Sequence, residues 1–252
     1  MTYREESGRN WRLILGDCLE VMATLEPVQH VITDPPFEVE AHTKARRSLK
    51  DAIEIDFAAI TPEEREAAAA HFARLASRWV IAFCQIEAVA AWRSVYEKAK
   101  LDWVRGGVWD KPNGAPQFTG DRPGQGFECL AIAHHKGRKR WNGGGKHAVW
   151  RCPLDHRAGG GGKQEHPTIK PTDLMLQLVE DFTDPGETIL DPYAGSASTG
   201  VAALRLGRRF IGVEKNPRYF DLACERLRAE ESNTTHHAAR AGQVALFGEV
   251  GT

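Results

Sequence analysis

Residues 187–199, Glu-Thr-Ile-Leu-Asp-Pro-Tyr-Ala-Gly-Ser-Ala-Ser-Thr, combine a short apolar run, an acid, a turn of small residues and the start of a helical pattern. Three other apolar runs also lead into an acid: Trp11–Leu15 before Asp17, Val28–Thr33 before Asp34, and Arg209–Val213 before Glu214. Short apolar runs that alternate with helical segments are typical of parallel strands in an α/β sheet. Open α/β proteins bind ligands at the carboxyl edge of such a sheet, so we expect a ligand site beside these acids.

Composition agrees with a globular chain. The 252 residues include 33 Lys and Arg against 34 Asp and Glu, and 42% are hydrophobic, which predicts one large domain and excludes disordered and fibrous classes. No apolar run approaches the roughly 18 residues that a membrane helix needs, and the N-terminus lacks the apolar stretch of a signal peptide. We expect a soluble, cytoplasmic protein with no membrane partner.

Further elements can be placed from local patterns. Thr61-Pro62-Glu63-Glu64 is a helix-start signal before an alanine-rich segment, and Trp79–Phe83 follows it as another strand. The runs Trp103–Trp109 and Cys129–His134 are expected to pair as strands around a turn-rich segment. The five cysteines form no Cys-x-x-Cys pair, so neither a disulfide scaffold nor a metal site is expected, although Cys152 and His156 could supply two ligands.

Asp34-Pro35-Pro36-Phe37 follows an apolar strand directly. Consecutive prolines have fixed φ and no N–H, and Pro36 favours an extended Pro35, which leaves the carbonyls as rigid acceptors. A carboxylate with a neighbouring carbonyl can hold both hydrogens of a planar amino group, while the ring stacks on the attached base. A strand-ending turn without function is the alternative for these four residues.

Two further motifs stand near the C-terminal half. The turn after Asp191 lets a ligand approach the backbone, and the helix that follows offers free N–H groups to an anion. Glu214 ends the next strand, where an acid can accept hydrogen bonds from a ribose diol. The alternative is a strand end whose carboxylate is simply exposed to solvent. His166-Pro-Thr-Ile-Lys-Pro171 places a cation just before a helix. The glycine fingerprint of nicotinamide oxidoreductases is absent.

Together these motifs, with Phe-Ile-Gly-Val-Glu214, resemble in kind and order the S-adenosylmethionine-dependent amino-methyltransferases of DNA in their beta arrangement. The resemblance runs from Leu13 to about Leu227. It implies a doubly wound, mostly parallel seven-stranded sheet, circularly permuted so that the catalytic half comes first. It also implies a catalytic half at 1–135, a basic target-recognition insert at 136–165, a cofactor-binding half at 166–230 and a flexible tail at 231–252.

The resemblance also implies roles for individual residues. Asp34 and the Pro35 carbonyl would receive the target amine, Pro36 would fix their geometry, and Phe37 would stack on the base. In the S-adenosylmethionine site, Asp17 and Cys18 would flank the adenine, and Glu214 would bind the ribose hydroxyls. Thr168 and Lys170 would help to hold the carboxylate end of the cofactor. Its methionine part would lie along Asp191, Pro192, Tyr193, Ala194, Gly195 and Ser196, with the hydroxyl of Ser198 nearby. Ala197-Ser198 stands where the family usually has Gly-Thr.

Basic charge gathers in one segment, because residues 136–170 hold nine Lys and Arg against two Asp and Glu. Double-stranded DNA is the expected partner, and the residues expected to contact it are Lys44, Arg46, Arg47, Arg138, Lys139, Arg140 and Lys146. A solvated surface loop is the alternative for the insert. The family resemblance also suggests a bacterial or phage-encoded, nucleoid-associated protein, which could form a homodimer. In the tail, Gln243–Phe247 resembles a peptide that docks on a sliding clamp.

The implied activity is methyl transfer from S-adenosylmethionine to the N6 amine of adenine in DNA, after the base has been flipped out of the duplex. An initial Asp in the Asp-Pro-Pro motif favours adenine N6, and cytosine N4 stays open as the second substrate. A catalytically silent DNA-binding homologue and a methyltransferase acting on RNA or protein are the other hypotheses. Retention of Asp34, Lys170, Asp191 and Glu214 argues against the silent homologue.

Overall fold

The computed structural model describes residues 3–37, 59–114, 116–154 and 169–233. This part of the chain forms one sheet of nine strands in the order β1-β2-β9-β8-β3-β4-β6-β5-β7. The strands are β1 (Arg4–Ser7), β2 (Trp11–Leu15), β3 (His30–Thr33), β4 (Trp79–Cys84), β5 (Asp102–Asp110), β6 (Phe127–His134), β7 (Val149–Arg151), β8 (Thr188–Asp191) and β9 (Arg209–Glu214).

The sheet is mostly parallel, as the sequence predicts. Pairings β2–β9, β9–β8, β8–β3, β3–β4 and β5–β7 are parallel, whereas β1 runs against β2, and β6 runs against both β4 and β5. The expected count of seven strands is wrong, because β1 and β7 extend the sheet at its two edges. The strand β1 is polar and β7 has only three residues, so neither has the apolar run that marked the others. The circular permutation stays a prediction.

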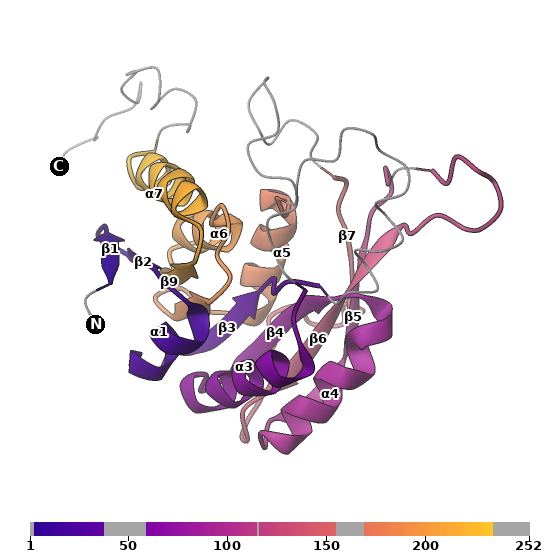
Figure 1. Ribbon diagram of the computed structural model, residues 1–252, viewed down its shortest axis with the longest axis horizontal. Coiled ribbons are helices and arrows are strands. Elements are labelled where there is room, and N and C mark those ends of the chain that lie inside the picture. Colours follow the sequence, from indigo (N-terminus) through magenta and orange to yellow (C-terminus); the bar gives the residue numbers. More distant parts are fainter. Residues whose placement is uncertain (1–2, 38–58, 115, 155–168, 234–252) are drawn as a thin grey trace.

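Helices cover both faces of the sheet (Figure 1). Helices α1, α3 and α4 contribute to the hydrophobic cluster on one face, together with Ile14, Val31 and Val80, and helices α5, α6 and α7 contribute to the cluster on the other face. The helical segments are α1 (Cys18–Thr24), α3 (Pro62–Leu75), the 3-10 turn η1 (Ile86–Ala88), α4 (Val89–Lys98), α5 (Thr172–Phe182), α6 (Ser198–Arg205) and α7 (Pro217–Glu231). The helix α3 begins where the helix-start signal predicts, and Thr61 and Glu64 form a capping box there.

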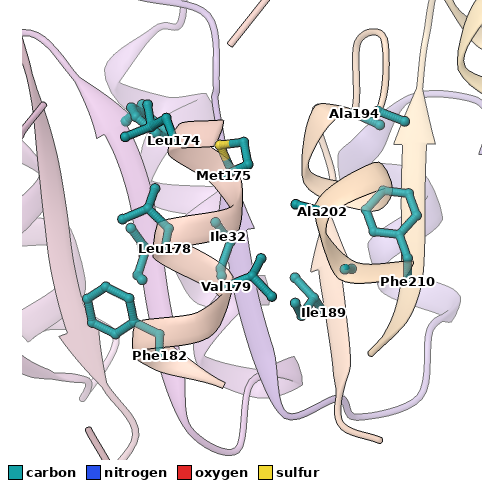
Figure 2. Close-up of a cluster of buried hydrophobic side chains, with 14 of the residues drawn as sticks. Ile32, Leu174, Met175, Leu178, Val179, Phe182, Ile189, Ala194, Ala202 and Phe210 are labelled. Carbon is teal, nitrogen blue, oxygen red and sulfur yellow. The ribbon is translucent and has the colours of Figure 1, made fainter. Parts of the chain in front are cut away.

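The alternation of side chains along buried strands separates these two cores. Leu13, Ile32 and Ile81 point to the α5–α7 side, while their neighbours in sequence point to the other. Figure 2 shows α5 on that side, with Leu174, Leu178 and Phe182 packed along it and Ile32 and Val179 close together. Because both faces of the central strands are buried, those strands are continuously apolar, and this is why they could be predicted from the sequence.

The direction of the strands decides which loops share an edge. The parallel strands β2, β3, β8 and β9 end together, so the segments that follow Leu15, Thr33, Asp191 and Glu214 meet at the carboxyl edge. The loop between β5 and β6 also projects from this edge. The segment after β6 starts at the opposite edge, because His134 pairs with Trp79, the first residue of β4.

Candidate functional site

A cavity of about 430 Å³ lies at the carboxyl edge of the central strands, within the size range of small-molecule sites. All four predicted catalytic residues, Asp34 to Phe37, line it. The predicted cofactor residues that also line it are Asp17, Cys18, Lys170, Asp191, Pro192, Tyr193, Ala194, Gly195, Ser196, Ser198 and Glu214. Thr168 lies outside the described residues. The structure thus joins two predicted sites in one cavity.

Asp34 has one carboxylate oxygen with a hydrogen-bond partner and one without. Its Oδ2 accepts a hydrogen bond from Lys170 Nζ at 2.5 Å. Its Oδ1 is shielded from solvent and has no hydrogen-bond partner within the described part of the chain. A buried acceptor without a partner costs free energy, on the order of 1 to 3 kcal/mol, which a donor entering the cavity would recover. Asp34 is therefore poised to accept a hydrogen bond from a ligand.

Lys170 is held by the catalytic motif, although the resemblance assigns it to the cofactor carboxylate. Its side chain is only 9% exposed, and Nζ lies 2.5 Å from Asp34 Oδ2 and 3.2 Å from Glu128 Oε2. The same ammonium lies 5.3 Å from the ring centre of Phe37 and 5.0 Å from that of Phe83. We conclude that Lys170 orients Asp34 and Phe37 in this structure.

Lys111 and Glu128 extend the ion pair into a chain of alternating charges. Glu128 starts the apolar part of β6, and its Oε1 accepts from Lys111 Nζ at 2.5 Å. Lys111 follows β5 directly, and its ammonium lies 4.4 Å from the ring centre of Trp109. Each charge thus has an opposite neighbour, as partly buried charges require.

The pKa values in this chain follow from burial and from neighbouring charges. Burial raises the pKa of Asp34 above its usual value, Lys170 opposes that rise, and Glu128 adds to it. Burial also raises the pKa of Glu128, but Lys170 and Lys111 outweigh it, so its pKa is lowered overall. Burial lowers the pKa of Lys170, but Asp34 and Glu128 raise it overall. Lys170 and Glu128 are therefore charged near neutral pH, and Asp34 is the member whose ionisation its neighbours can shift.

Asp191 uses both carboxylate oxygens within the protein. The hydroxyls of Thr33 and Thr199 donate to Oδ1 and Oδ2 at 2.7 Å each, and the Tyr193 N–H donates to Oδ1 at 3.1 Å. Burial raises the pKa of this carboxyl to about 6. The carboxylate joins β3, β8 and α6, so Asp191 fixes the shape of the turn that follows it.

The turn after Asp191 is held from the neighbouring strand. Glu214 Oε2 accepts from the Gly195 N–H at 2.8 Å, and Oε1 accepts from the Asn216 N–H at 2.7 Å. Burial raises the pKa of Glu214 to about 7. Gly195 and Ala197 have φ of +52° and +58°, a left-handed conformation that favours glycine. This explains why glycine is usual in the resembled family where this chain has Ala197.

Asp17 and Cys18 begin α1 at the same cavity. Asp17 caps the helix, because its Oδ1 accepts from the Leu19 N–H at 2.9 Å, and its Oδ2 lies 3.8 Å from Lys215 Nζ. Burial raises the pKa of the Cys18 thiol to about 11, and the thiol forms a hydrogen bond with Tyr193. The Cys18 thiol is therefore protonated near neutral pH, and it forms part of the cavity wall.

The predicted DNA contacts are not gathered around the cavity. The Trp79 indole donates to the Arg140 carbonyl at 2.6 Å, which places this residue at the amino edge, opposite the cavity. Lys139, Arg140 and Lys146 pair with Asp102, Asp184 and Asp181 at 3.1, 3.2 and 2.8 Å, and Arg138 is exposed nearby. Lys44, Arg46 and Arg47 lie outside the described residues. The described part of the insert before β7 therefore lies at the edge opposite Asp34, and its contact with DNA stays a prediction.

Several cavity groups were missed by sequence reasoning. Glu128 and Phe83 line the cavity, Thr33 and Thr199 hold Asp191, and Lys111 holds Glu128. The acid at position 128 was the available signal, because it interrupts an otherwise apolar strand. The described ranges contain no group of three or more His, Cys, Asp or Glu placed to hold a metal ion. Among the helices seen in these ranges, none is both long and apolar enough to cross a membrane.

Comparison with known proteins gives consistent matches. A family profile described as DNA methylase, and named for both N6 and N4 methylases, matches residues 28–225. YubD of Escherichia coli, named as a methylase, is 31% identical over 90% of this chain and 95% of its own length. The type II methyltransferase M.HinfI of Haemophilus influenzae is 25% identical over 88% of this chain and 69% of its own length. The crystal structure of an M1.HpyAVI–SAM complex superposes with a TM-score of 0.69 at 24% identity, over 86% of this chain and 98% of that one.

Proposed function

This chain belongs to the N6/N4 DNA methylase family, and from that premise we propose that it transfers a methyl group from S-adenosylmethionine to the N6 amine of adenine in double-stranded DNA. The observation that carries the proposal is the buried Oδ1 of Asp34, which has no hydrogen-bond partner within the described residues and belongs to a residue that lines one cavity with Pro35, Pro36, Phe37 and Glu214. The cavity thus offers an acceptor for an amine and, beside it, a cofactor pocket.

The residues present fit S-adenosylmethionine. Glu214, with a pKa of about 7, is an acceptor for ribose hydroxyls, and the tight turn at Gly195 lets a ligand approach the backbone. Cys18, Tyr193 and Leu19 give the cavity apolar walls at the start of α1, where an adenine ring can lie. When bound, S-adenosylmethionine supplies a methyl group on a sulfonium, the electrophile that a nucleophilic amine needs.

The chain's own residues would prepare the amine. An exocyclic amine is conjugated with its ring and is a weak nucleophile. Asp34 Oδ1 and the Pro35 carbonyl would accept its two hydrogens and favour a pyramidal nitrogen, while Phe37 stacks on the base. Because a paired base cannot reach this cavity, the base would be flipped out of the duplex. Positioning and electrostatic fit then account for the acceleration.

Adenine is favoured over cytosine by the initial Asp of the Asp-Pro-Pro motif, while the family profile covers both N6 and N4 enzymes. The test is to express the chain in a methylation-free bacterial host and sequence the DNA with detection of both modified bases. We expect N6-methyladenine at one short sequence. N4-methylcytosine at such a sequence would overturn the choice of base, and unmodified DNA from cells that contain the folded protein would overturn the activity.

Replacing Glu214 with Gln is expected to weaken S-adenosylmethionine binding about tenfold, the order of one lost charge-assisted hydrogen bond. Because the pKa of Glu214 is raised to about 7, the carboxylate is ionised above that pH and protonated below it. Affinity of the unaltered protein should therefore rise as pH increases through about 7, and the variant should lose this dependence. Calorimetric titration between roughly pH 6 and 8.5 measures both effects. Glu63→Gln, on the exposed start of α3, is the matched control, and equal affinities of Glu214→Gln and the unaltered protein would contradict the assignment.

Three further proposals concern the setting of the reaction. A role in restriction and modification is supported by the type II methyltransferase relative. A homodimer is supported by the family resemblance alone. Docking on a sliding clamp rests on the sequence Gln243–Phe247, which lies outside the described residues, and deletion of these five residues followed by a clamp pull-down would test it.

A further inference from the structure

Phe118 is exposed to an unusual degree. Its exposed fraction is 86%, whereas the other large hydrophobic residues exposed within the described ranges, Ile86 and Val149, reach 50% and 55%. Single exposed hydrophobic residues are common and need no function. The meaning of Phe118 therefore depends on where the fold presents it.

The loop that carries Phe118 is anchored to the catalytic charges. It spans 111–126 between β5 and β6, and the Lys111 N–H donates to the Gly126 carbonyl at 2.8 Å, which closes its base. Lys111 then pairs with Glu128, and Glu128 pairs with Lys170, which holds Asp34. Figure 1 shows the loop projecting from the end of the sheet beyond β5. The loop that carries Phe118 thus leaves the sheet at the edge that carries the cavity, although Phe118 does not itself line the cavity.

Polar contacts shape the loop without covering the ring. Gln117 Nε2 donates to Thr119 Oγ1 at 2.7 Å, and Thr119 contacts Asp121. Near the base, Asn113 exchanges two hydrogen bonds with the Leu154 backbone, at 2.9 and 2.6 Å. The loop is therefore held by hydrogen bonds within itself and to Leu154, while Phe118 stays exposed to water.

A cation stands close to the exposed ring in sequence. Arg122 lies four residues beyond Phe118 with 58% of its side chain exposed, and its nearest charged partner is the equally exposed Asp121 at 2.9 Å. An exposed ion pair of this kind is weak, so the guanidinium can exchange its partner for a phosphate at little cost. An apolar ring followed by an available cation fits a nucleic acid better than it fits an apolar protein surface.

We propose that Phe118 is a wedge that inserts into the DNA base stack beside the flipped target base, with Arg122 on the adjacent phosphate backbone. This inference rests on the proposed function and adds the residue that would occupy the space left by the extruded base. An aromatic ring can replace the stacking that the departing base loses. Insertion also slows the return of the base, which lengthens its residence against Asp34 and Phe37.

The test compares Phe118→Ala with the unaltered protein on two duplexes of the sequence that the protein methylates. One duplex is fully paired, and in the other the target base faces an abasic position, so that extrusion needs no unpairing. We expect kcat/KM to fall about tenfold on the paired duplex, the order of one lost base–aromatic stacking contact, and less than about threefold on the unpaired one. Phe118→Trp should restore most of the loss, and Val149→Ala, another exposed apolar side chain, should change neither rate.

Each other outcome counts against the wedge. An equal loss on both duplexes would show that Phe118 acts in general binding or folding. Unchanged rates on the paired duplex would show that the ring is not used. Absence of transfer by the unaltered protein to either duplex would overturn the proposed function and this inference with it, whereas the first two outcomes leave the proposed function standing.

Discussion

Asp34→Ala is expected to lower kcat at least about 1,000-fold while changing the dissociation constant of S-adenosylmethionine by less than about threefold. The substitution removes the Oδ1 acceptor, which has no partner within the described residues, and also the anion that neutralises Lys170. Because Glu128 still pairs with Lys170, the ammonium keeps one partner and the fold should survive. A large loss in kcat without a loss in cofactor binding identifies a group that acts on the amine and not on the cofactor.

Two further variants sharpen that experiment. Asp34→Asn keeps the size of the side chain but loses its charge, so it should stay well below the unaltered rate if the anion matters. Asp173→Ala removes an exposed carboxylate from the first turn of α5 and should leave kcat unchanged. Single-turnover methyl transfer to duplex DNA measures the rate, and equilibrium titration measures cofactor binding. A residual rate within tenfold of the unaltered protein would remove Asp34 from the chemistry.

The parts of the fold that sequence reasoning predicted share one physical property. The central strands are buried on both faces, so each appears as an apolar run that ends beside an acid, as Val31 and Ile32 do before Asp34. The edge strands were not predicted, because β1 is polar and β7 has only three residues. Their pairing depends on neighbouring strands that lie far away in sequence, and no local pattern records this.

Sequence reasoning predicted which residues lie at the candidate site, but not the contacts that these residues make with one another. Motif order placed Asp34, Asp191 and Glu214 at one edge, and the structure puts all three around one cavity. The hydrogen-bond partners of these carboxylates could not be predicted from the sequence, because Lys170 lies 136 positions from Asp34 and Thr33 lies 158 positions from Asp191. Such contacts are products of strand order, which one sequence does not specify.

The basic segment shows that local charge does not predict where a segment lies in the fold, and its contact with DNA stays a prediction. Its charge count predicted DNA contact, but β6 runs against β4 and delivers Arg140 to the amino edge, where Asp184 pairs with it. A local excess of Lys and Arg does not predict which edge of the sheet the segment reaches. Acids from distant segments can also neutralise its charge. The loop between β5 and β6 carries fewer charges but lies at the edge that carries the cavity, which makes it the stronger candidate for contact with DNA beside the target base.

Lys170→Met is expected to lower kcat/KM about 100-fold at neutral pH and to move the acid limb of the pH–rate profile to higher pH. Lys170 is the charge that opposes the rise in the pKa of Asp34 caused by burial and by Glu128. Without it that pKa rises further, so a larger share of Asp34 is protonated near neutral pH and cannot accept the amine hydrogens. Activity should recover as pH increases, because the carboxyl ionises again above its raised pKa.

The opposite sign is expected when the other neighbour is neutralised. Glu128→Gln removes a charge that raises the pKa of Asp34, so the acid limb should move to lower pH. Lys170→Arg keeps the cation and should stay nearest the unaltered profile, although its planar head changes the contact with Phe37. Thermal unfolding of each variant separates loss of fold from loss of rate, since breaking a buried pair destabilises a protein by roughly 3 to 5 kcal/mol. A loss that is the same at every pH in folded Lys170→Met would mean that the ammonium only positions Asp34, whereas opposite shifts in the two variants would show that the chain of charges sets its ionisation.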